Sequence, residues 1–427
     1  MNIVERGRAF AKGLHELATR SAWDWKQCPH CGSRVTIKNG AYTRQPWGLE
    51  GRERVRVQRH LCRECRRSYA EDSPWLVARS WYTRGVHRAA IDHWQHMGTS
   101  LRRTAEFLRS WLGHQERWRL WRPLDAVPRE GCHLAASTVH RWLDQAGERA
   151  VESIPDQLAG IESAAELGTD GLWARLKDQV VCVVLMTVNS VTGVIYPPIV
   201  AWDEAQASAW EQLFARAAQA GLQLQQIRGL TSDGAQGLLG YLREQLVWVE
   251  QQRCVWHVWR QLGRTLTQVV SQATATLEGP AAAQARRELR SALGKLLHQV
   301  VDATSATVAE VALRKLRAHP HGQALGQQLT HILDRLLVYR MAYCRGLQRV
   351  SPEWYWRDFR LRLSHGRNHR SEERLERAAV LWALYHNFEP AQWRSERKRH
   401  YRYPGQSALQ VAGVPPGQVS YLDALGI

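Results

Sequence analysis

Two aspartates in this 427-residue chain stand in similar surroundings. Asp170 lies in the segment AELGTDGLW and Asp233 lies in IRGLTSDGAQ, so each follows a short apolar stretch and precedes a glycine. A buried strand that ends on Asp-Gly places a carboxylate at the edge of a sheet, where a ligand can approach. Carboxylate oxygens are the ligands that Mg²⁺ and Mn²⁺ prefer, and two of them on neighbouring strands can share such ions. The pattern therefore predicts an acidic pair that binds divalent metal.

The overall charge indicates what such a site acts on. The chain carries 58 Lys and Arg against 40 Asp and Glu, a formal charge of +18. Residues 1–150 contain 27 of the bases and 15 of the acids, so +12 of the surplus lies in the first third. An excess this large and this polarised favours a polyanionic partner, although a solvated basic surface is the alternative. Arg is the dominant base, and it suits bidentate contacts to phosphate or guanine better than Lys does.

Nothing in the sequence indicates export or a membrane. The N-terminus, MNIVERGRAFAKGLHEL, has an early Glu and no apolar core of the kind that signal peptides carry. The longest apolar run, Val180 to Met186, is too short to span a bilayer and is typical of a buried strand. We expect a cytoplasmic protein of the bacterial nucleoid. In such a reducing compartment, paired cysteines are metal ligands rather than disulfides.

Two Cys-x-x-Cys knuckles indicate a structural zinc site. They are Cys28-Pro-His-Cys31 and Cys62-Arg-Glu-Cys65, and their separation suits a zinc ribbon. Four thiolates satisfy the tetrahedral preference of Zn²⁺ and leave no open position for catalysis. The metal would supply folding free energy to a module with little core of its own. A redox pair is the alternative, and His30 is a weaker candidate ligand.

The segment between the knuckles has strand character. RVTIKNGAYTRQ and RERVRVQRHL are both typical of strands, and Asn39-Gly40 predicts a turn. Val55 and Val57 alternate with Arg54 and Arg56, which gives one apolar face and one basic face. Arg54 and Arg56 are therefore candidates for DNA binding.

The pattern becomes helical after residue 75. Residues 84–96 form one candidate helix, and a second follows with Thr99 or Ser100 as its cap. In this second helix Leu101, Ala105 and Leu108 share one face.

A third helix, in the segment ASTVHRWL, has Ser137 or Thr138 as its cap and the features of a recognition helix. Its His140 and Arg141 would meet base edges or phosphate. Together these helices resemble a helix-turn-helix, with residues 113–132 inserted at the turn as a DNA-contacting arm or a packed loop. An ordinary helical connector is the alternative.

The central part of the chain alternates strands and helices. LGTDGLWARL, VVCVVLMTVN and VIYPPIVA predict three strands, with a turn at 190–193 between the last two. A helix over 204–220, a strand in QQIRGLTSD, a helix over 234–246 and a strand or strand-to-helix turn in QQRCVWHVW follow. This β-β-β-α-β-α-β order is that of the ribonuclease H-like fold, an α/β core with a mixed sheet. Residues 262–345 then predict an all-α insertion, broken near Gly279-Pro280 and Pro320.

A third carboxylate is needed for two-metal chemistry, in which two ions clamp the attacking and leaving oxygens of a phosphoryl group. Ser351-Pro352 opens a helix that has Glu353 in its first turn, and Glu376 in RLERAAVL is the rival. The segment AAVLWALYHNF predicts the helix that follows. Of the 20 tryptophans, we expect Trp202, Trp210 and Trp382 in the core. Trp354 and Trp356 are either core residues or platforms for unpaired bases.

The chain resembles DDE transposases of the Mutator-like superfamily and the related bacterial insertion-sequence families. Those families share an Asp, a second Asp followed by Cys-x-x-His, a helical insertion, and a Glu that opens a helix with trailing Arg residues. The matching residues here are Asp170, Asp233, Cys254 with His257, and Glu353 with Arg357. The resemblance covers about 160–390, and the zinc ribbon and helix-turn-helix ahead of it also fit bacterial members. In those families a Thr-Asn or Ser-Asn stretch usually flanks the Glu. In this chain the flank of Glu353 is Val350-Ser-Pro instead.

The resemblance implies a DNA transposase. It implies that Asp170, Asp233 and Glu353 hold two Mg²⁺ or Mn²⁺ ions, with Cys254, His257 and Arg357 beside them; Cys254 and His257 as core residues are the alternative. The partner would be double-stranded DNA: the enzyme would bind terminal inverted repeats, cut DNA by hydrolysis, and join the 3′-hydroxyl ends to target DNA by transesterification. A homodimer or larger assembly is expected because two ends must be brought together. The rivals are a DNA-binding regulator with an inactive core and a structure-specific nuclease without strand transfer.

These expectations divide the chain into four parts. Residues 1–75 contain the zinc ribbon, 76–155 the helix-turn-helix domain, 160–390 the catalytic core, and 391–427 a basic tail. We expect the tail to be extended along the DNA backbone or to serve as a dimer arm, with a disordered tail as the alternative.

Overall fold

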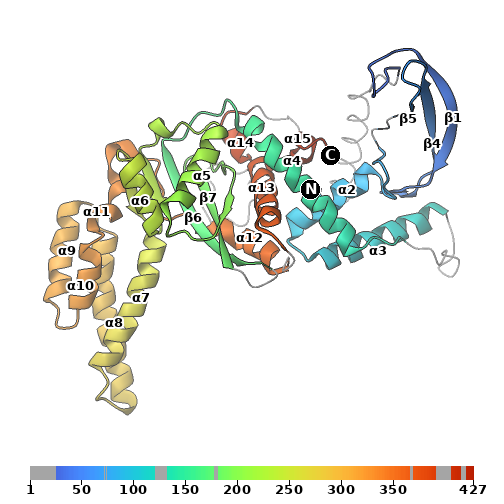
Figure 1. Ribbon diagram of the computed structural model, residues 1–427. Helices are drawn as coiled ribbons and strands as arrows, with labels where there is room; N and C mark the ends of the chain where they lie inside the picture. The colour runs from blue at the N-terminus through green and yellow to red at the C-terminus, as the bar shows by residue number, and fades with distance from the viewer. Residues whose placement is uncertain are drawn as a thin grey trace. The chain divides into compact units, whose positions relative to one another are not determined.

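The computed structural model describes residues 26–71, 73, 75–120, 132–176, 181–365, 369–390, 405–414 and 420–427. The chain divides into two compact units, residues 1–146 with 425–427, and residues 147–424. The boundary falls inside helix α4 (Ala136–Leu158), and the cysteine knuckles share the first unit with helices α2 and α3. Figure 1 shows the elements of both units.

A three-stranded antiparallel sheet carries the cysteine knuckles. It consists of β1 (Thr36–Arg44), β4 (Val55–Cys62) and β5 (Ser68–Ala70) in the order β1-β4-β5, and a short hairpin of β2 (Trp47–Gly48) and β3 (Gly51–Arg52) lies between the first two along the chain. Val57 is buried while Arg54 and Arg56 are exposed, as the alternation predicts. Asn39-Gly40 is not a turn between strands. The β1–β4 register shifts between Lys38 and Ala41, so the pair forms a bulge inside β1, with Gly40 at φ 73°.

The helices of the first unit are α2 (Arg84–Met97), α3 (Leu101–Leu120) and the first half of α4. The Ser100 side chain accepts a hydrogen bond from the Arg103 amide at 3.2 Å, so Ser100 is the cap of α3. Leu101, Ala105 and Leu108 are all buried, as their shared face predicts.

Two expectations for these helices need correction. α3 continues through the first part of the expected insert to Leu120, and residues 121–131 lie outside the described part of the chain. α4 begins at Ala136, where the Ala135 carbonyl accepts from the amides of Thr138 and Val139. The caps expected at Ser137 or Thr138 are therefore inside the helix.

The second unit is built on a five-stranded mixed sheet. Its strands are β6 (Glu166–Arg175), β7 (Val181–Asn189), β8 (Ile199–Ala201), β9 (Gly229–Ser232) and β10 (Glu250–Arg253), in the order β10-β9-β6-β7-β8. β6, β7 and β8 pair antiparallel, whereas β9 pairs parallel to both β6 and β10. β7 is an almost continuous apolar run because both of its faces are buried. This mixed α/β sheet agrees with the expected fold class at that level.

Helices cover both faces of this sheet. They are α5 (Ala207–Gln219), α6 (Gln236–Gln245), α12 (Glu353–His365) and α13 (Glu372–Phe388), and α5 and α13 both pack against β7 and β8. Their tryptophans Trp210, Trp356 and Trp382 are fully buried. Trp202 was expected in the core as well, but it lies in the loop before α5 and is 51% exposed.

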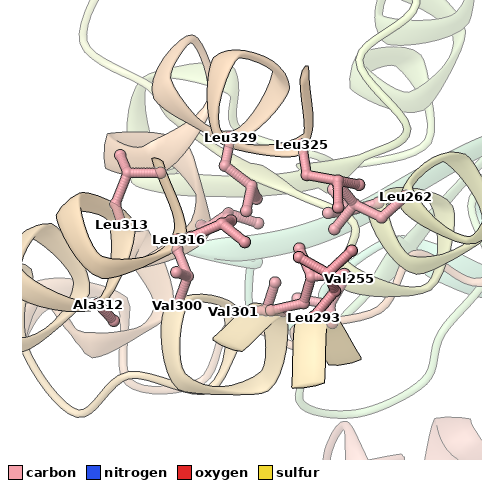
Figure 2. Packing of buried hydrophobic residues seen from close by; sticks show 13 residues of the cluster. Val255, Leu262, Leu293, Val300, Val301, Ala312, Leu313, Leu316, Leu325 and Leu329 are labelled. Atoms are coloured by element: carbon pink, nitrogen blue, oxygen red, sulfur yellow. The ribbon is translucent and has the colours of Figure 1, made fainter. Parts of the chain in front are cut away.

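Residues between the sheet and α12 form an all-α insertion as expected, but its first helix begins at Val255, before the expected residue 262. Its helices are α7 (Val255–Ala273), α8 (Gly279–Val301), α9 (Ala306–Ala318), α10 (Gln323–Thr330) and α11 (Leu333–Leu336). Figure 2 shows their shared core, in which Leu262, Leu293, Leu316 and Leu329 meet from four helices. The first breaker residue, Gly279, opens α8, and the second, Pro320, separates α9 from α10. Figure 1 shows α8 to α10 side by side in one bundle, drawn yellow to orange.

The C-terminal residues differ from the extended tail that was expected. In the described part of the tail, α14 (Ala408–Val411) and α15 (Tyr421–Ala424) are short helices, and Leu409 and Tyr421 are buried. The basic stretch from Arg394 to 404 and the N-terminus expected to lack an export signal lie outside the described residues. None of the helices described is both long enough and apolar enough to cross a membrane.

Candidate metal sites

The four knuckle cysteines come together in the first unit. Cys28 and Cys31 precede β1, Cys62 ends β4, and Cys65 lies in the turn before β5, and all four sulfurs lie within 4.8 Å of one another. The Sγ atoms of Cys28 and Cys65 are 3.6 Å apart, as are those of Cys31 and Cys62. Thiolates bound to one zinc ion at about 2.3 Å lie roughly 3.8 Å apart. The group therefore fits a tetrahedral zinc ion with no open position, and the exposed His30 is not part of it.

A second group of potential ligands lies in the second unit. Asp170 of β6, Asp233 after β9 and His257 in the first turn of α7 offer ligand atoms that lie within 4.8 Å of one another. These residues are 87 positions apart at the extremes, so only the sheet brings them together. Two carboxylates and an imidazole can hold a divalent metal ion.

The position of Asp170 differs in one respect from the expectation. Asp170 does not end its strand, because β6 continues to Arg175 and pairs Asp170 with Met186 of β7. On its other side β6 pairs with β9 only as far as Gly168 opposite Thr231. β9 then ends at Ser232, so Asp170 passes the end of β9 and meets Asp233 there. Asp170 is therefore beyond the paired part of the sheet because β9 is short, and not because β6 ends there.

Asp170 is the buried carboxyl of this group. Its side chain is almost fully buried, and its Oδ2 atom has no hydrogen-bond partner in the described part of the chain. Burial, followed by a hydrogen bond to Glu353 and the charges of Glu353 and Asp233, raises the pKa of Asp170 well above its usual range. A cation bound here would give the unpaired Oδ2 atom a partner and would reduce the repulsion between the carboxylates.

Glu353 reaches this edge as the first residue of α12, where its contact with Asp170 places it next to the first two acids. Pro352 lies against β6 so closely that a Cβ on Gly168 would come within 3.0 Å of its Cδ. The carboxylate of Glu353 accepts from Arg360 Nη2 at 2.9 Å. Glu353 lies outside the group whose ligand atoms are all within 4.8 Å of one another.

The rival acid Glu376 belongs to a different part of the second unit. It lies on α13, forms an ion pair with Arg216 of α5, and accepts a hydrogen bond from the Val200 amide at 3.3 Å. Its oxygens are therefore engaged in holding α5 and α13 to β8. Of the two candidates, the structure places Glu353 beside Asp170.

Cys254 connects two of the segments that supply the acids. It is fully buried between β10 and α7, and its sulfur accepts from the amide and hydroxyl of Ser351 at 3.2 Å and 3.3 Å. Burial would raise the pKa of this thiol, but hydrogen bonds from His257 and Ser351 outweigh it and lower the pKa. Cys254 thus fastens the turn before Glu353 to the strand end that precedes His257. Cys254 is therefore a buried residue that lies close to Asp170.

The arginine that contacts Glu353 is not the expected one. Arg357 is exposed on α12, whereas Arg360, one turn further, makes the ion pair. Trp356 is fully buried and is a core residue, while Trp354 is 53% exposed. In α4 of the first unit, Arg141 is exposed and His140 is half-buried.

Sequence reasoning missed two charged residues beside the acids. Glu204 was expected to begin a helix, but α5 starts at Ala207 and Glu204 lies in the loop before it. Its Oε1 accepts from the Trp173 indole at 3.0 Å, and its Oε2 lies 2.5 Å from where a Cβ on Gly171 would be. Burial and then the charge of Asp233 raise the pKa of Glu204.

Arg253 is the second missed residue. Its Nη1 lies 1.7 Å from where a Cβ on Gly234 would be, so a side chain at 234 would displace the guanidinium. The signal for both residues was the glycine that follows each aspartate: Glu204 crosses Gly171 and Arg253 crosses Gly234. A glycine next to a candidate metal ligand indicates that another group passes close to the backbone there, but it does not indicate which residue supplies that group.

The two groups differ in their ligands. The four cysteines can surround one zinc ion completely, whereas Asp170, Asp233 and His257 supply three ligands that could hold a metal ion. Comparison with protein-family models and with curated proteins finds no match to this chain.

Proposed function

We propose that this chain is a DNA transposase of the DDE type. The observation that carries the proposal is the meeting of Asp170, Asp233 and Glu353, from three distant segments, around a buried oxygen without a partner. Three such carboxylates are the ligand set that two-metal phosphoryl transfer requires. His257 and Glu204 add an imidazole and a fourth carboxylate at the same edge.

The sheet order supports a ribonuclease H-like core. The order β10-β9-β6-β7-β8, with only β6, β9 and β10 parallel, is the arrangement in which acids on the first and fourth strands are neighbours. The helical insertion lies between β10 and the helix that carries Glu353, as the resemblance to Mutator-like transposases implies.

The protein residues prepare this edge for a phosphodiester. Mg²⁺ or Mn²⁺ ions bound there would help to ionise a water or 3′-hydroxyl and would stabilise the departing oxyanion. Arg360 holds the Glu353 carboxylate, and Cys254 holds the turn before it, so the third acid is fixed before substrate arrives. Because the acids would serve as ligands rather than nucleophiles, no covalent protein–DNA intermediate is formed.

The first unit would bind the terminal inverted repeats. The Cys28, Cys31, Cys62 and Cys65 group can hold Zn²⁺, and the strand beside it exposes Arg56. Arg54, His140 and Arg141 are further candidates for phosphate or base contacts. Two element ends must be joined in one reaction, so we propose a homodimer or larger assembly on DNA.

The test is a cleavage assay with the full chain, Mg²⁺ and a supercoiled plasmid that carries the DNA flanking the gene. We expect nicks that leave 3′-hydroxyl ends, followed by products in which those ends are joined to target DNA. Asp233→Asn and Glu353→Gln should abolish both steps while DNA binding persists, whereas Glu376→Gln should keep them. Cleavage that survives Asp233→Asn would refute the assignment.

The same assay separates the rivals. A protein that cuts but never joins is a nuclease without strand transfer. A protein that binds the flanking DNA and neither cuts nor joins with Mg²⁺ or Mn²⁺ is a regulator with an inactive core.

A further inference from the structure

Arg253 is the last residue of β10 and pairs with Ser232, the last residue of β9. The next residue after Ser232 is Asp233, so Arg253 and Asp233 lie at adjacent strand ends. The Arg253 side chain then crosses Gly234, whose φ of +81° and missing side chain leave room for the guanidinium. The cation is therefore held against the backbone beside one of the acids.

The guanidinium of Arg253 is poorly satisfied by the protein. In the described part of the chain it makes no hydrogen bond and no ion pair, and its Nε is buried without an acceptor. Burial lowers the pKa of Arg253, and the charge of Asp233 opposes that effect, yet an arginine remains protonated in a protein. Among the described residues no hydrogen bond or ion pair joins Asp233 to this guanidinium, and the Asp233 Oδ1 accepts instead from the Ala235 amide at 3.0 Å.

A second guanidinium makes the region more positive. Arg335 of α11 acts on Arg253 as a repelling charge, and its own weak contacts, at 3.4 Å, go to Gln251 Oε1 and the His331 carbonyl. Arg253 is half-buried, and a guanidinium whose buried Nε has no acceptor, next to another cation, is a place where a bound anion offsets the cost of burial. Among anions, phosphate matches the planar fork of arginine in two parallel hydrogen bonds.

We infer that Arg253 binds a phosphate group of the nucleic-acid strand that reaches Asp170, Asp233 and Glu353. This inference rests on the proposed function, because it takes the carboxylate edge as a phosphodiester site. The acids repel a phosphodiester, and Arg253 supplies the opposite charge from the protein itself. The glycine after Asp233 is then required for substrate binding, since any side chain there would displace the guanidinium.

The test uses the full chain, Mn²⁺ and a thymidine dinucleotide as the smallest phosphodiester probe. Isothermal titration calorimetry measures dinucleotide binding with and without Mn²⁺, and electron paramagnetic resonance measures Mn²⁺ binding. Arg253→Gln should weaken dinucleotide binding by about tenfold or more, since a charged hydrogen-bond pair is lost, and should leave Mn²⁺ affinity within about twofold. Arg253→Lys should bind more tightly than Arg253→Gln, because it keeps the charge but not the fork.

The control is Arg243→Gln, which removes the same charge from an exposed position on α6 and should bind the dinucleotide as the wild type does. Equal dinucleotide affinity in Arg253→Gln and wild type would overturn the inference, as would an equal loss in Arg243→Gln. A loss of Mn²⁺ affinity in Arg253→Gln would also overturn it, because Arg253 would then maintain the acids instead. Absence of Mn²⁺ binding in the wild type is a separate result that would remove the proposed function.

Discussion

Two groups of side chains bring potential metal ligands together, and they do so in different ways. They are the cysteine group (Cys28, Cys31, Cys62 and Cys65) and the carboxylate edge (Asp170, Asp233 and Glu353). The cysteines come from residues 28–65 and close around one position, with ligand spacing set by two local knuckles. The acids come from residues 170–353 and meet only because β9 is shorter than β6 and because α12 starts against Gly168. A structural site can be encoded by local spacing, whereas an open site is encoded by where strands end.

The two groups also differ in their effect on stability. Zinc bound to four thiolates contributes folding free energy directly. Without metal, the carboxylate edge lowers the stability of its unit, because Asp170 is buried beside Glu353 and Asp233 with one oxygen unpaired. We therefore expect the first group to hold its unit together and the second to destabilise its unit until a cation binds.

The largest expected effect is on the cysteine group. Cys62→Ser should release the metal and unfold the β1-β4-β5 sheet, because zinc supplies about 10 kcal/mol or more to modules of this size. Hydrogen exchange should show lost protection in 36–70 and unchanged protection in β6 and β7. Cys132→Ala, a buried cysteine of the same unit that is not a ligand, is the control and should keep the sheet. An intact sheet in the zinc-free Cys62→Ser protein would contradict the comparison.

The second prediction concerns Asp170 and has the opposite sign. In metal-free protein, Asp170→Asn should raise the melting temperature by roughly 2–4 °C for each kcal/mol of repulsion removed. Because the pKa of Asp170 is raised, the penalty is absent below the unfolded pKa of about 3.9, grows as pH rises, and is complete above the folded pKa. The advantage of the variant should therefore be largest at neutral pH and vanish in acid. Thermal scans at several pH values measure it, and a destabilised variant at pH 7 would break the comparison.

A third prediction sharpens the part that Glu204 plays at the edge. A methyl on Gly171 would meet Glu204 Oε2 at 2.5 Å and Val183 Cγ2 at 3.1 Å, so Gly171→Ala should displace the carboxylate without removing a charge. We expect Gly171→Ala and Glu204→Gln each to weaken Mn²⁺ binding about tenfold, as the loss of one ligand-side interaction of about 1.4 kcal/mol implies. Gly240→Ala, where a Cβ meets only the Ala207 side chain at 3.7 Å, should bind Mn²⁺ normally. Unchanged Mn²⁺ affinity in Glu204→Gln would exclude Glu204 from the site.

The smallest effect concerns the support behind the third acid. Asp358 of α12 accepts from Arg362, Trp382 and His386 at 2.7, 3.0 and 2.9 Å. Burial opposes ionisation, but these hydrogen bonds and charges outweigh it and lower the pKa of Asp358. Asp358→Asn should cost about 1 kcal/mol at pH 7, since the side chain is more than a third exposed and partly screened.

Because the pKa of Asp358 is lowered, its contribution to stability is present above the unfolded value near about 3.9 and is lost as pH falls toward the folded value. Urea titrations at pH 7 and pH 3 should therefore show a difference between variant and wild type that narrows in acid. This is the opposite of the expectation for Asp170, and the same trend for both variants would contradict the electrostatic account.

The sequence predicted which strands and helices the second unit contains better than it predicted where they begin and end. The apolar run of β7 and the glycine and proline breaks around α8 and α9 are strong local signals, and those elements lie where they were expected. β8 is shorter than its apolar run, because Pro197 and Pro198 interrupt the pairing with β7. Ile195, ahead of them, pairs with Val188 only as an isolated bridge. Trp202 lies in a loop, which composition could not reveal.

Those residues of the candidate sites that belong to a local sequence motif could be predicted from the sequence. The knuckle cysteines needed only spacing, and Asp170 and Asp233 needed only the strand and glycine pattern. Glu204 and Arg253 have no motif, because a loop and a strand end bring them there in three dimensions. Glu353 pairs with Arg360 and not with Arg357, and helical periodicity leaves this choice open because both arginines lie on the Glu353 side of α12.

The central claim is that segments around Asp170, Asp233, His257 and Glu353 share bound metal. Fe²⁺ substituted for Mg²⁺, with ascorbate and peroxide, generates hydroxyl radicals at the metal and cuts the nearby backbone. The account predicts cuts in the full chain close to all four residues at once, and their joint loss in Asp170→Asn and in excess Mg²⁺. Cuts near only one of the four residues, or a pattern that Asp170→Asn leaves unchanged, would contradict it.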